Sequence, residues 1–418
     1  MYQGLSVNLL NLILSLSDAL DLASPELSQH QLRTAFIAWE ISKVAGLTSA
    51  NIDLLLIASL LHDIGALSLE NKIAVHQGET RDSEPHCILG AQVIRPVPVL
   101  GRSAEIIRYH HTSWQVLGRS REPNHKASQI LLLSDVLERS IDRNTYILHQ
   151  NQTITSKINS LSDTFIDPEV VECFNSVAVR EEFWLDLVSP RMYSILLHNG
   201  LSRSIDIDLE FLTPISELFR NIIDFRSRFT ATHSCGVATT ASTLARLLGF
   251  TETEVGVMGV AGNLHDLGKL VIPNSILEKP DKLIKDEIAI MRQHTYFTYM
   301  VLNTIGGILQ ISEWAAFHHE KLDGSGYPFH LRADKLSLGA RIMAVADIYT
   351  ALAEDRPYRK GMSRQETLSI LGELSANKHL DVNVFRVLKE NYEEVHELTK
   401  RSQVEIEEYY EHEFASMG

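Results

Sequence analysis

Ten of the eighteen histidines in this chain fall into two sets that repeat one order of residue types. Each set holds a histidine, a His-Asp pair, a histidine, a His-His pair and an aspartate. The first set is His30, His62, Asp63, His86, His110, His111 and Asp135; the second is His233, His265, Asp266, His294, His318, His319 and Asp347. In both sets 32 positions separate the first histidine from the His-Asp pair, and 24 separate the third from the His-His pair. Imidazole and carboxylate are typical transition-metal ligands, so the repeat predicts two metal sites.

Helices are expected to position these residues. Apolar side chains recur three or four positions apart in segments such as 239–248, 255–267 and 338–352, and no run shows strict alternation. The sequence therefore predicts an all-α fold of two tandem helical domains. His265 and Asp266 end one predicted helix, His318 and His319 close another, and Asp347 lies within a third. Several helices would then direct side chains into one cavity, as in di-metal helical proteins.

The length of 418 residues is too great for one compact core and fits two domains. The periodic pattern loosens between residues 189 and 208, around Pro190 and Gly200, which predicts an N-terminal domain over 1–199 and a C-terminal domain over 200–418. The tail over 389–414 is rich in Glu and Tyr. We interpret it as a solvated helix, with packing and dimer formation as alternative roles.

Composition narrows the function without identifying it. A net charge of −15 argues against polymeric nucleic acid as a partner, but not against a small anion held on bound metal. Cys87, Cys173 and Cys235 form no CxxC motif, which suits a reducing cytosol, and we interpret Cys87 and Cys235 as small buried packing residues. The apolar run at 5–16 is interrupted by Asn8 and Asn11, and predicts a buried helix, not a membrane span. We therefore expect a soluble, cytoplasmic protein.

The second set offers seven ligands, which is more than a single ion with an open coordination position needs. We predict two divalent ions in the C-terminal domain, bridged most simply by Asp266. Nitrogen and oxygen donors favour iron or manganese, with nickel, cobalt and zinc as alternatives, and disfavour calcium.

Three stretches of the second half carry a family resemblance. They are Asn-Leu-His-Asp-Leu-Gly-Lys at 263–269, His-His-Glu-Lys-Leu-Asp-Gly-Ser-Gly-Tyr-Pro at 318–328, and Ala-Val-Ala-Asp-Ile-Tyr-Thr-Ala-Leu at 344–352 with Arg-Pro-Tyr-Arg at 356–359. Residues 215–390 resemble the HD-GYP family, a bacterial branch of the HD-superfamily phosphohydrolases that hydrolyses cyclic dinucleotides. The resemblance implies that His233, His265, Asp266 and Asp347 form the general HD set. It also implies that His294, His318 and His319 hold a second metal.

The chemistry expected of such a site is phosphodiester hydrolysis. Two nearby metal ions lower the pKa of a shared water, so that hydroxide can attack phosphorus. Asp266 and Lys269 are the predicted catalytic residues, with Lys269 placed on the phosphate oxygens or, alternatively, exposed at a helix end. Gly326, Tyr327 and Arg356 are candidates for substrate binding. Tyr327 would stack on a base or close its loop, and Arg356 would contact phosphate or guanine, or form a salt bridge within the fold.

One position departs from the family pattern. Some members bind a third metal through a Glu one helical turn before the first histidine, where this chain has Phe229. We therefore predict two ions, not three, in the C-terminal site.

The first set keeps every ligand type but lacks the residues around them. Ala66 stands where the second set has Lys269. The His-His pair continues into Thr112 and is not followed by a counterpart of Gly326-Tyr327-Pro328, the segment that we call the GYP loop. Whether metal binds there stays open. Three roles are considered: a structural partner, a regulatory site that senses a ligand, and a hydrolase with another substrate. Glu26, one turn before His30, is either an additional ligand or an exposed helix residue.

The predicted function is a metal-dependent phosphodiesterase that converts a cyclic dinucleotide to the linear dinucleotide. The order of domains resembles a vibrio group that degrades 3′3′-cGAMP, whereas cyclic di-GMP is the family's commoner substrate. Two other functions are weighed: a catalytically silent cyclic-dinucleotide receptor or protein-interaction module, and a phosphohydrolase of mononucleotides. A homodimer and a protein partner of the diguanylate cyclase type are left open.

Overall fold

The computed structural model describes residues 5–22, 27–66, 84–117, 123–201, 204–225, 232–279, 281–355 and 360–414. Contacts between residues divide the chain into two compact units, which we call the N-terminal and C-terminal units. The N-terminal unit is Asn8–Asp206, and the C-terminal unit is Ile207–Gly418 together with Met1–Val7. This division lies a few residues beyond the boundary that the sequence predicted at 199 and 200.

In the described part of the N-terminal unit, the regular secondary structure is almost entirely helical. The helices are α1 (Leu9–Asp21), α2 (His30–Val44), α3 (Ser49–Leu60), α5 (Glu84–Ile94), η1 (Gly101–Ser103), α6 (Ala104–Arg108), α7 (Trp114–Leu117), α8 (Pro123–Arg139), α9 (Ile147–Ser160), α10 (Pro168–Ala178), α11 (Glu181–Leu187) and α12 (Met192–Asn199).

The C-terminal unit is likewise helical. Its helices are α13 (Leu209–Phe225), α14 (His233–Leu247), α15 (Glu252–Leu264), η2 (Leu267–Val271), α16 (Asn274–Leu277), α17 (Lys285–Ile305), α18 (Leu309–Ala316), η3 (Ala333–Lys335), α19 (Leu338–Ala353), α20 (Arg364–Ala376), α21 (Val382–Glu390) and α22 (Tyr392–Phe414). The predicted all-α fold is confirmed.

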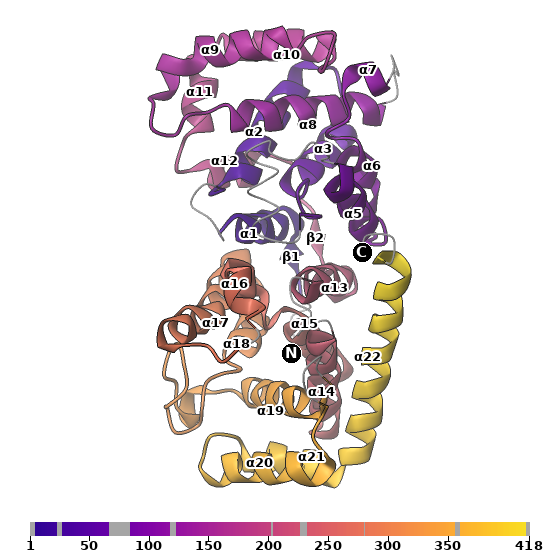
Figure 1. Cartoon of the computed structure of the whole chain (residues 1–418), viewed down its shortest axis with the longest axis vertical. Helices are drawn as coiled ribbons and strands as arrows, with labels where there is room; N and C mark the ends of the chain where they lie inside the picture. Colours follow the sequence, from indigo (N-terminus) through magenta and orange to yellow (C-terminus); the bar gives the residue numbers. More distant parts are fainter. Residues whose placement is uncertain are drawn as a thin grey trace. The chain divides into compact units, whose positions relative to one another are not determined.

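The two units repeat one packing scheme. In the N-terminal unit α2 packs against α3 and α8, and α5 packs against α6; in the C-terminal unit α14 packs against α15 and α19, and α17 against α18 (Figure 1). The first histidine of each set begins α2 or α14, and the last aspartate lies in α8 or α19. The sequence repeat is therefore a repeat of helices as well as of ligands.

Strands are almost absent from the described residues. β1 (Val7–Asn8) pairs with β2 (Asp206–Ile207), and the division between the units falls within both strands. Two residues per strand are too few to give the alternating pattern by which strands are recognised in a sequence.

Local sequence signals explain where the helices that carry ligands begin. Thr251 and Glu254 form a capping box at the start of α15, and the Ser337 side chain caps α19. Such caps satisfy backbone N–H groups that the first helical turn leaves unpaired. In α15 the cap sets the position from which the helix runs to its end beside His265.

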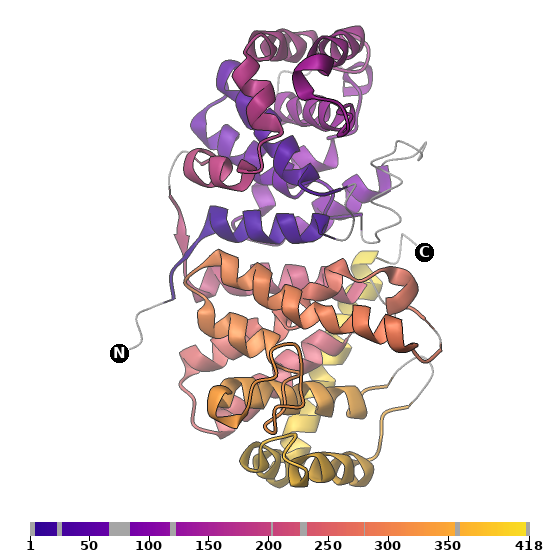
Figure 2. The same cartoon turned by 90° about the vertical axis from the view of Figure 1, so that its left-hand side faces the viewer.

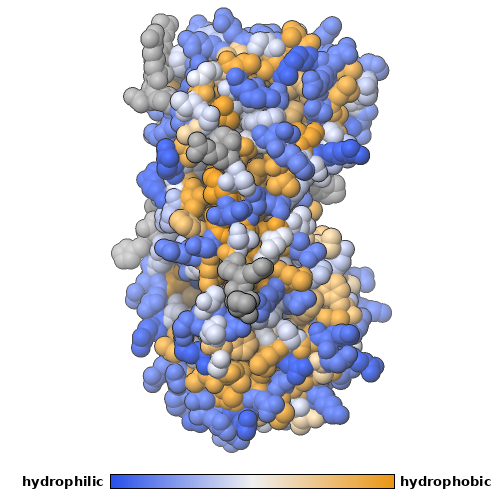
Figure 3. Space-filling model, turned by 180° about the vertical axis from the view of Figure 1, so that it is seen from behind, coloured by the Kyte–Doolittle hydropathy of each residue, from blue (hydrophilic) through white to orange (hydrophobic). Residues whose placement is uncertain are grey.

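The apolar run near the start of the chain forms α1, most of whose residues are buried. The predicted buried helix is thus confirmed. None of the described helices has both the length and the apolar composition needed to cross a bilayer. On the face shown in Figure 3, hydrophilic side chains predominate with hydrophobic patches between them.

The C-terminal tail forms α22, which runs beside α14 (Figure 1). Its Tyr410 ring lies 4.6 Å from that of Phe225, and the Tyr410 hydroxyl donates to Asn221 at 3.1 Å. The Gln403 side chain donates to the Thr232 carbonyl at 3.3 Å. One face of the tail therefore packs against the unit, which is the packing role that the sequence analysis gave as an alternative.

Candidate metal centres

All seven residues of the second set converge within the C-terminal unit. His233 begins α14, His265 and Asp266 follow α15, and His294 lies inside α17. The His318-His319 pair follows α18, and Asp347 lies inside α19. Six of the seven side chains are almost fully buried, and His319 is the exception at 30% exposure. The helix ends expected from the sequence are those that the structure has.

Three of these histidines are oriented by their own backbone. Their Nδ1 atoms lie 2.6–2.8 Å from carbonyl oxygens three residues earlier: His265 from Gly262, His294 from Met291 and His318 from Ala315. Because a carbonyl oxygen only accepts, each Nδ1 carries a proton, and in a neutral ring the Nε2 atom then presents a lone pair. Burial lowers the pKa of His294 to about 3 and that of His318 well below its usual value, so both rings are neutral.

These lone pairs face other lone pairs. The Nε2 atoms of His294 and His318 lie 3.3 Å apart, and His265 Nε2 lies 3.1 Å from Asp266 Oδ2. His265 Nε2 is buried without a hydrogen-bond partner among the described residues. Acceptors packed against acceptors are unfavourable unless a cation lies between them. The arrangement therefore fits a bound metal ion.

Asp266 lies between two groups of candidate metal ligands. Its Oδ2 faces His265, and its Oδ1 lies 3.5 Å from His294 Nε2. The donor atoms of His233, His265 and Asp347 form one group within 4.8 Å of one another, and those of His294, His318 and His319 form another. An aspartate with one oxygen toward each group is placed as a bridging ligand would be.

Glu354 holds the first histidine. Its carboxylate lies 3.3 Å from His233 Nδ1, and Asp347 Oδ1 lies 3.1 Å from His233 Nε2. Burial lowers the pKa of His233, but Glu354 and Asp347 outweigh it and raise the value to about 10. His233 is therefore protonated near neutral pH in the metal-free protein. A metal that bound its Nε2 would displace one proton.

Lys269 contacts the site directly. Its Nζ donates to Asp266 Oδ2 at 2.6 Å, and the side chain is only 19% exposed. Burial lowers the pKa of Lys269, but Asp266 outweighs it and raises the pKa above its usual value. The structure thus places Lys269 on the central carboxylate, a partner that the sequence did not suggest.

The GYP loop covers His319. The Tyr327 ring lies 5.0 Å from that of His319. The Arg292 guanidinium lies over the Tyr327 ring, 5.0 Å from its centre. Buried Glu320 accepts hydrogen bonds from the Phe329 and Leu331 backbone at 2.7 and 2.9 Å. The loop can be followed as the orange trace after α18 in Figure 2.

Gly326 has a packing reason to be glycine. A Cβ at this position would lie 2.4 Å from the Lys321 nitrogen and 2.6 Å from the His319 carbonyl. The residue lets the loop close on the backbone of the His-His pair. Arg356, the other substrate-binding candidate besides Tyr327, lies outside the described residues, as do Phe229 and Glu26.

The glycine after each His-Asp pair allows a close approach between backbones. A Cβ on Gly268 would lie 1.9 Å from the His294 carbonyl oxygen, and one on Gly65 would lie 2.1 Å from the His86 carbonyl oxygen. Thr298 strengthens the first contact, since its hydroxyl donates to the His265 carbonyl at 3.0 Å and accepts from the Gly268 backbone at 2.9 Å. Both glycines therefore fix the distance from the His-Asp pair to the third histidine.

The residues of the first set also converge, within the N-terminal unit. His62 Nδ1 lies 2.8 Å from the Ser59 carbonyl, and His110 Nδ1 lies 2.7 Å from the Ile107 carbonyl. Their counterparts His265 and His318 make the same contact. His30 Nε2 lies 3.3 Å from His62 Nε2. Asp63 again lies between two groups, 3.5 Å from His30 through Oδ2 and 3.5 Å from His86 through Oδ1. His111 Nε2 lies 3.9 Å from Asp135 Oδ2, and these two residues complete the set.

The two sites differ in the positively charged side chain that contacts an aspartate. In the first site Arg139 contacts Asp135 at 2.6 Å from one helical turn away, and Ala66 occupies the position of Lys269. In the second site Ala351 follows Asp347 by four positions, and the cation is Lys269 on Asp266. The positive charge thus neutralises a different aspartate in each copy.

Sequence reasoning missed the outer partners of the ligands. Glu138 contacts His30 Nδ1 at 2.6 Å, as Glu354 contacts His233. Each of these glutamates follows the last aspartate of its set, by three positions and by seven. A ligating histidine commonly donates its second ring N–H to a carboxylate, so an acidic residue near the last aspartate was a usable signal.

Comparison with known proteins identifies both units. Models described as HD domain match residues 27–140 and residues 217–384. A Vibrio cholerae protein named 3′3′-cGAMP-specific phosphodiesterase 1 is 28% identical over 406 residues, which cover 94% of each chain. A Pseudomonas aeruginosa protein named cyclic di-GMP phosphodiesterase is 39% identical over 159 residues, 38% of each chain.

A solved structure gives the same relationship. The crystal structure of a cyclic GMP-AMP specific phosphodiesterase of Vibrio cholerae matches with a TM-score of 0.64 and 25% identity, and covers 92% of this chain and 97% of that one. The two helical units with their His and Asp clusters are thus HD domains in tandem. The chain belongs to the HD-GYP family of the HD superfamily.

Proposed function

We propose that the C-terminal unit hydrolyses one 3′-5′ phosphodiester bond of a cyclic dinucleotide and releases the linear dinucleotide. One observation carries the proposal: buried, neutral imidazoles present lone pairs to each other and to Asp266, which lies between the two ligand groups. Two divalent ions fit this donor set, with iron or manganese first and nickel, cobalt or zinc as alternatives. When bound, such ions supply a nucleophile from water at neutral pH and polarise the phosphoryl group.

Other steps of the proposed reaction depend on side chains of the C-terminal unit. Asp266 bridges the two ligand groups and holds their spacing. Lys269 offsets the negative charge of Asp266, so that the site can accept a phosphodiester anion. His319 is the most exposed of the proposed ligands, and its ring lies 5.0 Å from that of Tyr327, which supports a role for Tyr327 in stacking on a base of the substrate.

The choice of substrate is supported by domain order. The relative that matches nearly the whole chain, both HD domains included, is named for 3′3′-cGAMP. The relative named for cyclic di-GMP matches 38% of the chain. We therefore propose 3′3′-cGAMP as the preferred substrate, with cyclic di-GMP as the alternative.

A substrate panel tests the proposal. Metal-loaded protein is incubated with 3′3′-cGAMP, cyclic di-GMP and cyclic di-AMP, in parallel with Asp266→Ala, and products are separated by chromatography. Linear dinucleotide from 3′3′-cGAMP with wild type alone is the expected result. Intact metal content with no product from any substrate would contradict the enzyme and favour a receptor.

The first set is proposed as a second metal site. Its donors reproduce the geometry of the second set, whereas Ala66 replaces the cation of the central carboxylate. No hydrolysis of the dinucleotide is assigned to it.

A further inference from the structure

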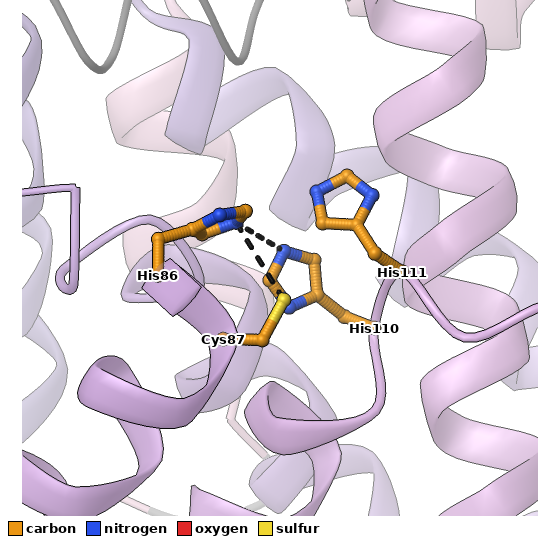
Figure 4. Close-up of side chains that lie close together, drawn as sticks. All are labelled: His86, Cys87, His110 and His111. Carbon is orange, nitrogen blue, oxygen red and sulfur yellow. Dashed lines mark hydrogen bonds between the residues drawn. The ribbon is translucent and has the colours of Figure 1, made fainter. Parts of the chain in front are cut away.

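The first site contains a sulfur atom that the second site lacks. Cys87 follows His86 at the start of α5, and its Sγ lies 3.7 Å from His86 Nε2. The donor atoms of His86, Cys87, His110 and His111 all lie within 4.8 Å of one another (Figure 4). Cys87 was interpreted from the sequence as a packing residue. It is buried, but its sulfur belongs to a cluster of ligand atoms.

We infer that His86, Cys87, His110 and His111 form a closed, structural zinc site with three imidazoles and one thiolate. Such a site uses four protein ligands and leaves no position open for water. The ion would hold α5 against the His-His pair that follows α6. Asp63 would serve the neighbouring group of His30 and His62, to which its Oδ2 points. Its Oδ1 lies 3.5 Å from His86 Nε2 and 4.0 Å from His110 Nε2, but Asp63 belongs to the group of His30 and His62 and not to the group of four donors that includes Cys87.

The spacing of the atoms fits zinc. With zinc–nitrogen bonds of about 2.0–2.1 Å and a zinc–sulfur bond of about 2.3 Å, a tetrahedral ion separates two nitrogens by roughly 3.3 Å and a nitrogen from sulfur by roughly 3.6 Å. The Nε2 atoms of His86 and His110 lie 3.4 Å apart, and Cys87 Sγ lies 3.7 Å from His86 Nε2. Two edges of the tetrahedron are therefore present in the protein.

A second observation independently indicates a ligand. The His111 side chain is nine-tenths buried, and its Nε2 has no hydrogen-bond partner among the described residues.

The second copy provides an internal comparison. Thr295 follows His294 as Cys87 follows His86, and its hydroxyl donates to the Arg292 carbonyl at 3.1 Å. The corresponding group in the C-terminal unit therefore has three histidines and no fourth donor from this helix. That difference leaves the C-terminal group open for water and closes the N-terminal one. On zinc binding the Cys87 S–H proton is released to solvent as the sulfur–metal bond forms.

Cobalt substitution of the full-length protein tests the inference. Metal-free protein is saturated with Co²⁺, and its absorption spectrum is recorded for wild type and for Cys87→Thr, which copies the second site. We expect a near-ultraviolet thiolate-to-cobalt band in wild type and its loss in Cys87→Thr. Absence of the band in saturated wild type, or its persistence in the variant, would overturn the inference.

The other two cysteines provide matched controls. Cys235 donates through its thiol to the Ser402 carbonyl at 3.5 Å, and the Cys173 sulfur lies 3.9 Å from the Val44 carbonyl. Cys235→Ser and Cys173→Ser should each keep the band. If Cys87→Thr does not fold, zinc-edge X-ray absorption of wild type decides: a sulfur neighbour at about 2.3 Å supports the site, and nitrogen and oxygen neighbours alone reject it.

Discussion

His294 and His318 face each other through Nε2 atoms 3.3 Å apart, although both carry their ring proton on Nδ1. Neither ring can donate to the other, so the contact is stable only with a cation between or beside the two nitrogens. In the first set the Nε2 atoms of His86 and His110 lie 3.4 Å apart, and His110 Nδ1 lies 2.7 Å from the Ile107 carbonyl. The backbone carbonyls thus orient histidines of both sets as metal binding would require.

Removal of the Asp266 carboxylate should show which of the two sites carries out hydrolysis. Asp266→Ala is expected to lower turnover of the cyclic dinucleotide by at least ~100-fold, because outer partners alone are worth about 10–100-fold and Asp266 faces both ligand groups. Asp63→Ala is the matched variant. It should leave turnover near wild type but reduce metal content. Equal loss of turnover in both variants would contradict the assignment of hydrolysis to the C-terminal unit.

Lys269 should affect catalysis through Asp266. Lys269→Ala, which copies Ala66, is expected to lower kcat/KM by roughly 10–100-fold, because Asp266 loses its buried cation partner. Steady-state kinetics and metal analysis measure the two effects separately. Lys279→Ala, which removes a cation paired with Glu287 at 2.7 Å, is the control and should behave as wild type. Unchanged kinetics in Lys269→Ala would exclude a role for this lysine.

Metal binding should depend on pH through His233. Its pKa is raised from 6.5 to about 10 in the folded, metal-free protein. The stabilising contribution of the charged ring is therefore complete below pH 6.5 and is lost as the pH rises through about 10. Because metal displaces this proton, apparent metal affinity should rise between pH 7 and 9, with proton release measurable by calorimetry.

Glu354 tests the cause of that pH dependence. Glu354→Gln removes the carboxylate that contacts His233 Nδ1, so the pKa of His233 should fall. The dependence of metal affinity on pH should then flatten. The affinity itself should fall by about 10–100-fold through loss of the oriented imidazole. A pH profile identical to wild type would show that another group releases the proton.

Gly268 should be intolerant of any side chain. In Gly268→Ala the new Cβ would meet the His294 carbonyl 1.9 Å away, so α17 must move. We expect a loss of about 1–3 kcal/mol in unfolding free energy, typical of overpacking, together with weaker metal binding. Gly259→Ala is the control in α15, since its Cβ would meet only the Ser242 hydroxyl, at 3.3 Å. Thermal denaturation of both variants distinguishes a local clash from a general effect of alanine.

The sequence alone predicted the all-α class, the two copies and the helices beside His265-Asp266, His318-His319 and Asp347. These features were predictable because helical periodicity and ligand spacing are local properties of the chain. The environment of each ligand was not predictable in this way. The contact of Lys269 with Asp266 depends on the direction of two side chains. The contact of Glu354 with His233 and the packing of α22 along α14 join residues that are distant in sequence.

The comparison between Cys87 and Thr295 illustrates this division. The sequence determined that each residue follows the third histidine of its set. Only the tertiary structure decided that the Cys87 sulfur lies among the nitrogens of His86, His110 and His111, whereas the Thr295 hydroxyl turns to its own helix. The physical reason is that a ligand set is defined by distances between side chains from several helices, and those distances are fixed only when the helices pack.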